Sequence, residues 1–253
     1  MKAMILAAGL GTRLRPLTDD RPKALVEVAG RTLLEITLTR LRSFGVGEVI
    51  INVHHFAGTI VEYLQRNDNF GMRIEVSREE TLLDTGGGLK KAAPFFLESA
   101  SDSEAPFFVH NVDVISTIDL DRMLRFHIEN RALATLAVQD RETSRYLLFD
   151  QQLRLCGRQS GRDQAELVRS CENVQPLAFS GVHVISPRLF SVMKEEGSFS
   201  ITDAYLQLAA GGADLMGFRA DEYYWRDVGS LASLRQAAED LAQATIRLWS
   251  SRQ

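Results

Sequence analysis

The sequence predicts an α/β protein with a three-layer α/β/α, Rossmann-like arrangement, in which helices cover both faces of a mixed sheet. The first observation is a rhythm: through the first 140 residues, apolar runs typical of buried strands alternate with segments of helical spacing. The second is that small and charged residues follow directly after several apolar runs, where open α/β sheets bind ligands. A chain of 253 residues, 45% of them hydrophobic, is long enough to bury one large core.

The alternation defines the elements of the first half. Thr32 and Glu35 form a capping-box pattern at the start of the first helix, and Gly45 is placed to end it. The glycine-rich stretch 83–88 is predicted to be a loop. The predicted strands are 2–7, 25–28, 48–53, 72–76, 106–112 and 133–138, and the predicted helices are 33–44, 57–66, 89–96 and 120–129.

The second half is richer in short β-strands. Residues 225–229 are predicted to form a loop, and no internal repeat or linker is visible. We therefore predict one domain, 1–253, with halves at 1–140 and 141–229 and a C-terminal helix at 230–253. The remaining predicted strands are 146–149, 153–156, 178–185 and 215–219, and the predicted helices are 187–195, 202–210 and 230–248.

Composition restricts the partners. A net charge of -4 supplies no basic field for nucleic acid. The longest apolar runs fall short of the ~18 residues of a membrane span, so no membrane partner is expected and the cytoplasm is the expected location. Cys156 and Cys171 form no CxxC pair, and reduced, structural thiols are predicted.

The stretch from Met4 to Leu25 is the candidate phosphate site. A P-loop string GxxxxGK[ST] does not occur, and the dinucleotide fingerprint fails because Leu14 replaces its third glycine and prolines interrupt the helix. A longer loop remains, whose backbone N–H groups face an anion that Arg13 and Lys23 neutralise. An ordinary exposed loop explains Arg15 and Arg21, but it explains the combination of Arg13 and Lys23 poorly.

The motif Leu6-Ala-Ala-Gly-Leu-Gly-Thr-Arg13, with Pro16 and Pro22-Lys23 after it, resembles the signature of the sugar-1-phosphate nucleotidylyltransferases. The resemblance implies the nucleotide-diphospho-sugar transferase fold and a β-rich sugar-binding half. It also implies Mg²⁺-dependent joining of a nucleoside triphosphate to a sugar 1-phosphate with release of pyrophosphate. The implied nucleotide contacts in this loop are Leu6, Ala7, Ala8, Gly9, Gly11, Thr12, Arg13 and Lys23, and the implied catalytic residues are Arg13, Lys23 and Asp113.

Three further motifs carry the same resemblance. The glycine-rich segment implies base contacts by Thr85, Gly86 and Gly87, although a triple glycine alone is more often a turn. Asp113 ends an apolar strand as in the family's Asn-Gly-Asp, with valine in place of the glycine. Asp227 stands in Trp-Arg-Asp-Val-Gly, which resembles the family's second metal contact. Asp113 and Asp227 are therefore the expected Mg²⁺ ligands.

The sugar side is less complete. Ser180 and Gly181 stand in a strand similar to the family's Phe-Ser/Thr-Gly, and with Asn111 they are the expected sugar contacts. The family's Glu-Lys-Pro lysine is missing, and either Arg158 or Arg145 could replace it. His54 and His55 could line the nucleotide cleft or serve as capping or core residues.

The compact chain resembles short bacterial members that act on N-acetylmuramate 1-phosphate or mannose 1-phosphate, as a monomer or small homo-oligomer. A cytidylyltransferase for phosphocholine or a similar monoester is one alternative. A non-catalytic nucleotide-sugar-binding regulator is another, but such a protein would be expected to lose Lys23 or the two acids. A dinucleotide-dependent oxidoreductase is disfavoured by Leu14 and the prolines.

Overall fold

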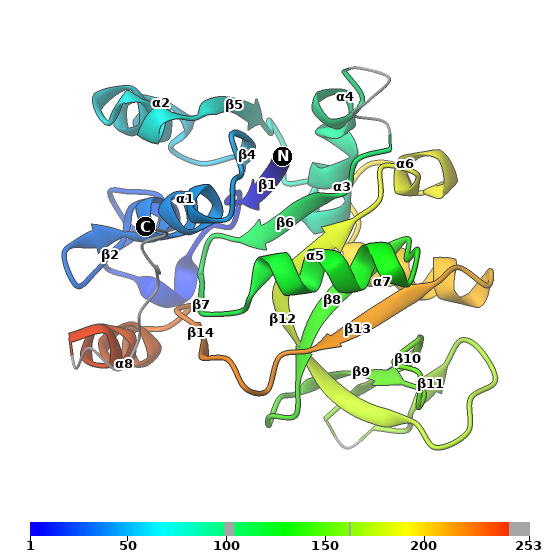
Figure 1. Ribbon diagram of the computed structural model, residues 1–253. Helices are drawn as coiled ribbons and strands as arrows, with labels where there is room; N and C mark the ends of the chain where they lie inside the picture. The colour runs from blue at the N-terminus through cyan, green and yellow to red at the C-terminus, as the bar shows by residue number, and fades with distance from the viewer. Residues whose placement is uncertain (99–103, 162, 243–253) are drawn as a thin grey trace. The chain divides into compact units, whose positions relative to one another are not determined.

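The computed structural model describes residues 1–98, 104–161 and 163–242 (Figure 1). The chain forms two compact units, each assembled from separate stretches of sequence. Unit 1 contains Met1–Leu82, His110–Ile118 and Tyr223–Gln253, and unit 2 contains Leu83–Val109 and Asp119–Glu222. Among the described residues, no helix has the length and apolar character needed to cross a membrane.

Unit 1 is built on three parallel strands, with β4 between β1 and β5. Lys2 pairs with Glu48 and Glu48 with Arg73, so the three strands end at the same edge. The Thr32 side chain accepts a hydrogen bond from the Glu35 N–H and caps α1 as predicted. The elements are β1 (Lys2–Leu6), η1 (Thr12–Leu14), η2 (Lys23–Leu25), β2 (Glu27–Val28), β3 (Arg31–Thr32), α1 (Leu33–Ser43), β4 (Glu48–Val53), α2 (Ala57–Arg66), η3 (Asp68–Gly71), β5 (Arg73–Arg78), β7 (Val114–Ser116), β14 (Trp225–Asp227) and α8 (Leu231–Ala242).

Unit 2 is built on the long strand β12, which pairs antiparallel with both β8 and β9. β10 and β11 extend the antiparallel part from β9, and β13 adds a parallel strand to β8. The elements are α3 (Asp84–Lys91), α4 (Ala93–Phe96), α5 (Leu120–Glu129), β8 (Ala134–Gln139), β9 (Arg145–Phe149), β10 (Leu155–Ser160), β11 (Glu166–Leu167), β12 (Gln175–Ile185), α6 (Leu189–Val192), α7 (Ile201–Ala210) and β13 (Leu215–Arg219). β6 (Phe107–Asn111) begins in unit 2 and ends in unit 1.

Parallel and antiparallel pairings both occur and helices accompany them, so the predicted mixed α/β fold is confirmed. The predicted division into halves at 1–140 and 141–229 stays a prediction. The two compact units of the structure are a different division, because each is discontinuous in sequence.

The glycine-rich stretch 83–88 is not a loop: α3 begins at Asp84 and includes all three glycines. The Gly86 N–H donates to the Phe199 carbonyl over 2.9 Å. A Cβ on Gly86 would lie 2.3 Å from the Phe199 ring, and one on Gly87 would lie 2.2 Å from the Gly197 carbonyl oxygen. This close approach explains why the helix tolerates glycines, which each cost about 1 kcal/mol in a helix interior.

Two other predicted elements need correction. Residues 225–229 were predicted as a loop, but Trp225–Asp227 forms β14 and pairs with β7, with Asp227 opposite Val114. The predicted helix 187–195 is reduced to the single turn of α6. The predicted C-terminal helix is present as α8 to Ala242, and its last residues, 243–248, lie outside the described residues.

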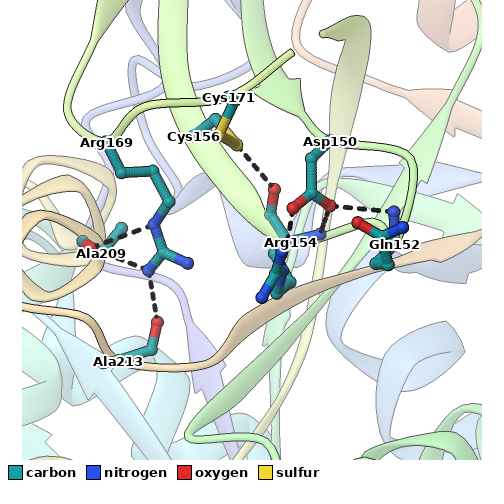
Figure 2. The surroundings of a disulfide bond; sticks show 8 residues. All are labelled: Asp150, Gln152, Arg154, Cys156, Arg169, Cys171, Ala209 and Ala213. Carbon is teal, nitrogen blue, oxygen red and sulfur yellow. Dashed lines mark hydrogen bonds and ion pairs between the residues drawn. A yellow bond between two sulfur atoms is a disulfide. The ribbon is translucent and has the colours of Figure 1, made fainter. Parts of the chain in front are cut away.

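The prediction of reduced thiols is wrong, because Cys156 and Cys171 form a disulfide (Figure 2). The chain leaves β10 and folds back through β11, and the Val168 N–H donates to the Cys156 carbonyl over 2.8 Å. That return brings the two Cα atoms to 6.4 Å, within the range a disulfide spans. Two residues from Cys171, the Arg169 guanidinium donates to the carbonyl of Ala209 in the last turn of α7 and to that of Ala213 beyond its end.

We predict that Cys171→Ser lowers the free energy of unfolding by about 3 kcal/mol. The disulfide joins cysteines that are 15 positions apart, and the chain-entropy relation gives about this stabilisation for a loop of that size. Urea titration without reductant measures the loss. Dithiothreitol should destabilise the wild-type protein and leave Cys171→Ser unaffected. Two reactive thiols in the unreduced, denatured wild-type chain would contradict this account.

Candidate active site

The loop that follows β1 turns at Gly11, where two constraints require glycine. Its φ is +64°, in the left-handed region that favours glycine. A Cβ there would lie 3.0 Å from Thr18 Cγ2 and 3.1 Å from Lys23 Cβ. The Thr18 hydroxyl also donates to the Gly11 carbonyl over 2.9 Å. The loop is therefore folded back so that its two ends, Gly11 and Lys23, lie side by side.

Leu14 stands where a dinucleotide fingerprint has its third glycine, and it is fully buried. Its N–H donates to the Gly11 carbonyl over 2.9 Å. Leu14 thus anchors the loop to the core. Arg15 pairs with Asp19, and Arg21 with its neighbour Asp20, all on exposed side chains. The interpretation of Arg15 and Arg21 as surface charges fits this geometry.

Lys23 is held rigidly and aimed at Asp113. It opens η2 directly after Pro22, and the next two residues, Ala24 and Leu25, are buried. Lys23 Nζ forms an ion pair with Asp113 Oδ2, and the two side chains are only 11% and 18% exposed. Because water screens so sheltered a pair less than a surface pair, the attraction between its charges is stronger.

Asp113 follows the end of β6, beside the ends of β1 and β14 in unit 1. The Val112 N–H donates to the Leu6 carbonyl over 3.1 Å, which places this turn beside the end of β1. The Val228 N–H donates to the Asp113 carbonyl over 2.9 Å. Asp113 and Asp227 are therefore carried by neighbouring backbone segments, although 114 positions separate them in the sequence.

Gly229 gives Arg13 its place beside Asp227. The Gly229 N–H donates to Asp227 Oδ1 over 2.6 Å and fixes one carboxylate oxygen. A Cβ on Gly229 would lie 2.6 Å from Arg13 Nη2 and also 2.6 Å from Asp227 Oδ1. The glycine of the Trp-Arg-Asp-Val-Gly motif is thus needed because an arginine from the first loop fills the space above it.

A hydrogen-bond and ion-pair network that the sequence did not predict connects β14 with α8. Arg226 forms an ion pair with Asp240 of α8 over 2.9 Å, and the Tyr224 hydroxyl donates to the same carboxylate over 2.7 Å. Burial, followed by the hydrogen bond to Asp240, raises the pKa of Tyr224 to about 12. The hydroxyl therefore stays protonated as a donor. No spacing in the sequence connects Asp240 with Arg226.

The predicted nucleotide contacts of the first loop all lie in unit 1, as does the predicted sugar contact Asn111, which ends β6. The predicted base contacts and the remaining sugar contacts lie in unit 2: Thr85, Gly86, Gly87, Ser180 and Gly181. The Thr85 hydroxyl accepts a hydrogen bond from the Ile201 N–H at the start of α7 over 3.0 Å. Ser180 is fully buried, and Gly181, with φ of +71°, lies where the pairing of β12 with β8 shifts register. Such bulges re-aim side chains and are frequent beside active sites.

Of the two arginines that could replace the missing Glu-Lys-Pro lysine, Arg158 already forms ion pairs within the protein. It pairs with Glu166 over 2.7 Å and with Asp203 over 2.6 Å. Arg145 has an exposed side chain on β9. His54 Nδ1 contacts the Glu79 carbonyl over 2.8 Å, so it connects the residue after β4 with the residue after β5 rather than capping α2, whose N-cap is Phe56.

Solved structures share this fold along nearly the whole chain. A putative glucose-1-phosphate thymidylyltransferase from Bacillus anthracis has a TM-score of 0.78 at 20% identity, covering 99% of this chain and 98% of the other. HddC from Yersinia pseudotuberculosis, complexed with GMP-PN, has a TM-score of 0.75 at 20% identity, covering 95% and 99%. The fold is thus the α/β fold of the nucleotide-diphospho-sugar transferases.

Residues 2–160 match the family model described as nucleotidyl transferase. An N-acetylmuramate alpha-1-phosphate uridylyltransferase from Caulobacter vibrioides is 34% identical over 96% of this chain and 97% of its own length. The chain belongs to the nucleotidyl transferase family.

Two other relatives carry different names. A UTP–glucose-1-phosphate uridylyltransferase from Synechocystis is 27% identical over 98% of this chain and 65% of its own length. A mannose-1-phosphate guanyltransferase from Yarrowia lipolytica is 30% identical over 90% and 61%. The chain thus spans less than two thirds of these two relatives. The predicted enzyme class, a sugar-1-phosphate nucleotidyltransferase, is confirmed, and the cytidylyltransferase and regulatory alternatives are not favoured.

We predict that Gly229→Ala lowers turnover by about 100-fold, because displacing a charged group by about 1 Å at a reacting centre has effects of that size. The new methyl group would push the Arg13 guanidinium away from Asp227. Steady-state rates measure the loss, and urea titration checks the fold. Gly47→Ala is the matched control, since a Cβ there meets nothing within 4 Å. Equal rates for both variants would contradict the proposed crowding.

Proposed function

We propose that the chain transfers a uridylyl group from UTP to N-acetylmuramate α-1-phosphate and releases pyrophosphate. The enzyme class rests on one observation above the others: Lys23 at the end of the glycine loop is paired with Asp113 at the edge of the sheet. The choice of substrates rests on the Caulobacter relative, which matches this chain along nearly the whole length of both.

In the proposed reaction, an oxygen of the acceptor phosphate attacks the α-phosphorus of the triphosphate. A new P–O bond forms on the acceptor, the bond to the β-phosphate breaks, and pyrophosphate leaves with the electron pair. No protein nucleophile is needed, because the acceptor oxygen is already anionic. Catalysis is then positioning and charge stabilisation.

The chain's own groups supply that stabilisation. We assign Arg13 to the departing pyrophosphate and Lys23 to the α-phosphate, with backbone N–H groups of Ala8 to Thr12 around the remaining oxygens. Arg13 has an exposed side chain close to Gly229. Lys23 is sheltered and fixed by η2, so little reorientation is required when the phosphate arrives.

Nucleotidyltransferases generally use a divalent metal, and we propose Mg²⁺ held by Asp113 and Asp227. The donor chemistry fits, because carboxylate oxygens are ligands that Mg²⁺ prefers. A cation, the Lys23 ammonium, already lies against Asp113 in the structure. Bound there, Mg²⁺ would neutralise phosphate charge during the transfer.

We further propose that Asn111, Ser180 and Gly181 contact the sugar and that Thr85 contacts the base. For Gly86 and Gly87 the packing against Phe199 and Gly197 is a sufficient reason for glycine. Their nucleotide contacts therefore need independent support, which saturation-transfer NMR with UTP would give.

We expect Lys23→Ala and Asp113→Asn each to lower kcat by at least about 100-fold, the scale of losing one charge-stabilising group at a transition state. Arg15→Ala is the control, because its exposed pair with Asp19 lies outside the proposed machinery. Circular dichroism melting checks that the variants fold. Near-normal turnover in either site variant would rule out the assigned roles.

The proposed substrates are tested by pyrophosphate release from four nucleoside triphosphates against a panel of sugar 1-phosphates with Mg²⁺. UTP with N-acetylmuramate 1-phosphate should give the highest kcat/KM. A different best pair would overturn the substrate choice and leave the enzyme class standing. No pyrophosphate from any pair would overturn the class.

A further inference from the structure

A buried chain of polar groups connects the ends of the three parallel strands of unit 1. The Ala7 N–H donates to Asn52 Oδ1 over 2.8 Å, and Asn52 Nδ2 donates to Glu79 Oε1 over 2.8 Å. Asn52 is 2% exposed and Glu79 is 4% exposed. Asn52 pairs with Leu6 on β1 in the strand register. This series of hydrogen bonds thus runs from Glu79 after β5, through Asn52 of β4, to Ala7, where the phosphate loop leaves β1.

Glu79 is itself fixed by main-chain contacts. Its N–H donates to the Val53 carbonyl over 2.7 Å, and its own carbonyl contacts His54 Nδ1 over 2.8 Å. An asparagine amide can present either its oxygen or its nitrogen to Ala7. Because Glu79 Oε1 accepts from Asn52 Nδ2, the amide nitrogen faces Glu79 and the amide oxygen is left for the Ala7 N–H.

Burying polar groups is costly unless they are hydrogen-bonded, and even a bonded pair is often no more stable than an apolar one of similar volume. Apolar side chains of similar size would fill the same space between strands. What they would not supply is an acceptor for a main-chain N–H at the start of the loop. The polar chain therefore has a specific consequence: it fixes the direction in which the backbone departs from β1 toward Gly9 and Gly11.

We propose that Asn52 and Glu79 are positioning residues for nucleotide binding, with Glu79 orienting the Asn52 amide and Asn52 holding the phosphate loop at Ala7. This inference rests on the proposed function of that loop. It predicts that substituting Asn52 weakens binding of the nucleoside triphosphate more than binding of the acceptor.

The polarity of the pair permits an exchange test. Asn52→Asp loses the donor and places two carboxylates together, and the expected rise in KM for UTP is about 30-fold or more. Glu79→Gln should change KM by less than about threefold, since a glutamine oxygen still accepts from Asn52. In the double variant Asn52→Asp with Glu79→Gln, the aspartate can accept from both the Ala7 N–H and the introduced glutamine amide. The KM for UTP should therefore return to within about fivefold of wild type.

Thr37→Val is the matched control. It removes another buried hydrogen bond of unit 1, from Thr37 Oγ1 to the Leu33 carbonyl in α1. It should lower the midpoint of urea unfolding and leave KM for UTP unchanged. If Asn52→Asp does not fold, Asn52→Ser serves in its place for binding, with the same direction of effect on UTP affinity.

Calorimetric titration with UTP separates the two levels of the proposal. A wild-type protein that binds no nucleoside triphosphate would overturn the proposed function. Wild-type and Asn52→Asp proteins that bind UTP equally tightly would overturn the positioning role alone. So would a double variant with a KM for UTP no better than that of Asn52→Asp.

Discussion

The pairing of Lys23 with Asp113 is the interaction on which the candidate site depends. It joins the end of the glycine loop to the turn beyond β6, and it is sheltered enough to hold both side chains in place. Without phosphate, each charge neutralises the other. In the proposed reaction, Lys23 would turn to a phosphate and Asp113 to a metal ion, so the pair would keep an anion site and a cation site side by side until substrate binds.

Glycines make this arrangement possible by close contact rather than by flexibility. Gly11 admits Lys23 and Gly229 admits Arg13, each at a distance that a methyl group would obstruct. Gly86 follows the same rule in unit 2, where it admits the Phe199 ring. A glycine in a motif is therefore best read together with the side chain that fills its space.

The sequence was sufficient for elements whose signals are local. Periodicity located most strands and helices, and Thr32 capped α1 as expected. It failed where a distant partner decides the structure. Phe199 turns the glycine stretch into a helix, β7 turns the chain before Gly229 into a strand, and the return through β11 joins two cysteines. The motif acids and cations were expected from the resemblance of their motifs and their roles stay predictions, whereas Asn52 belongs to no local pattern.

In the proposed reaction, fixed charges position two substrates for direct transfer, with no nucleotidyl group carried on the protein. Isotope exchange tests this most directly. Labelled pyrophosphate should enter UTP when the nucleotide sugar product is present, because the reverse reaction regenerates UTP. With UTP, Mg²⁺ and enzyme alone, no label should enter UTP. Exchange without any sugar substrate would reveal a covalent nucleotidyl–enzyme and contradict direct transfer.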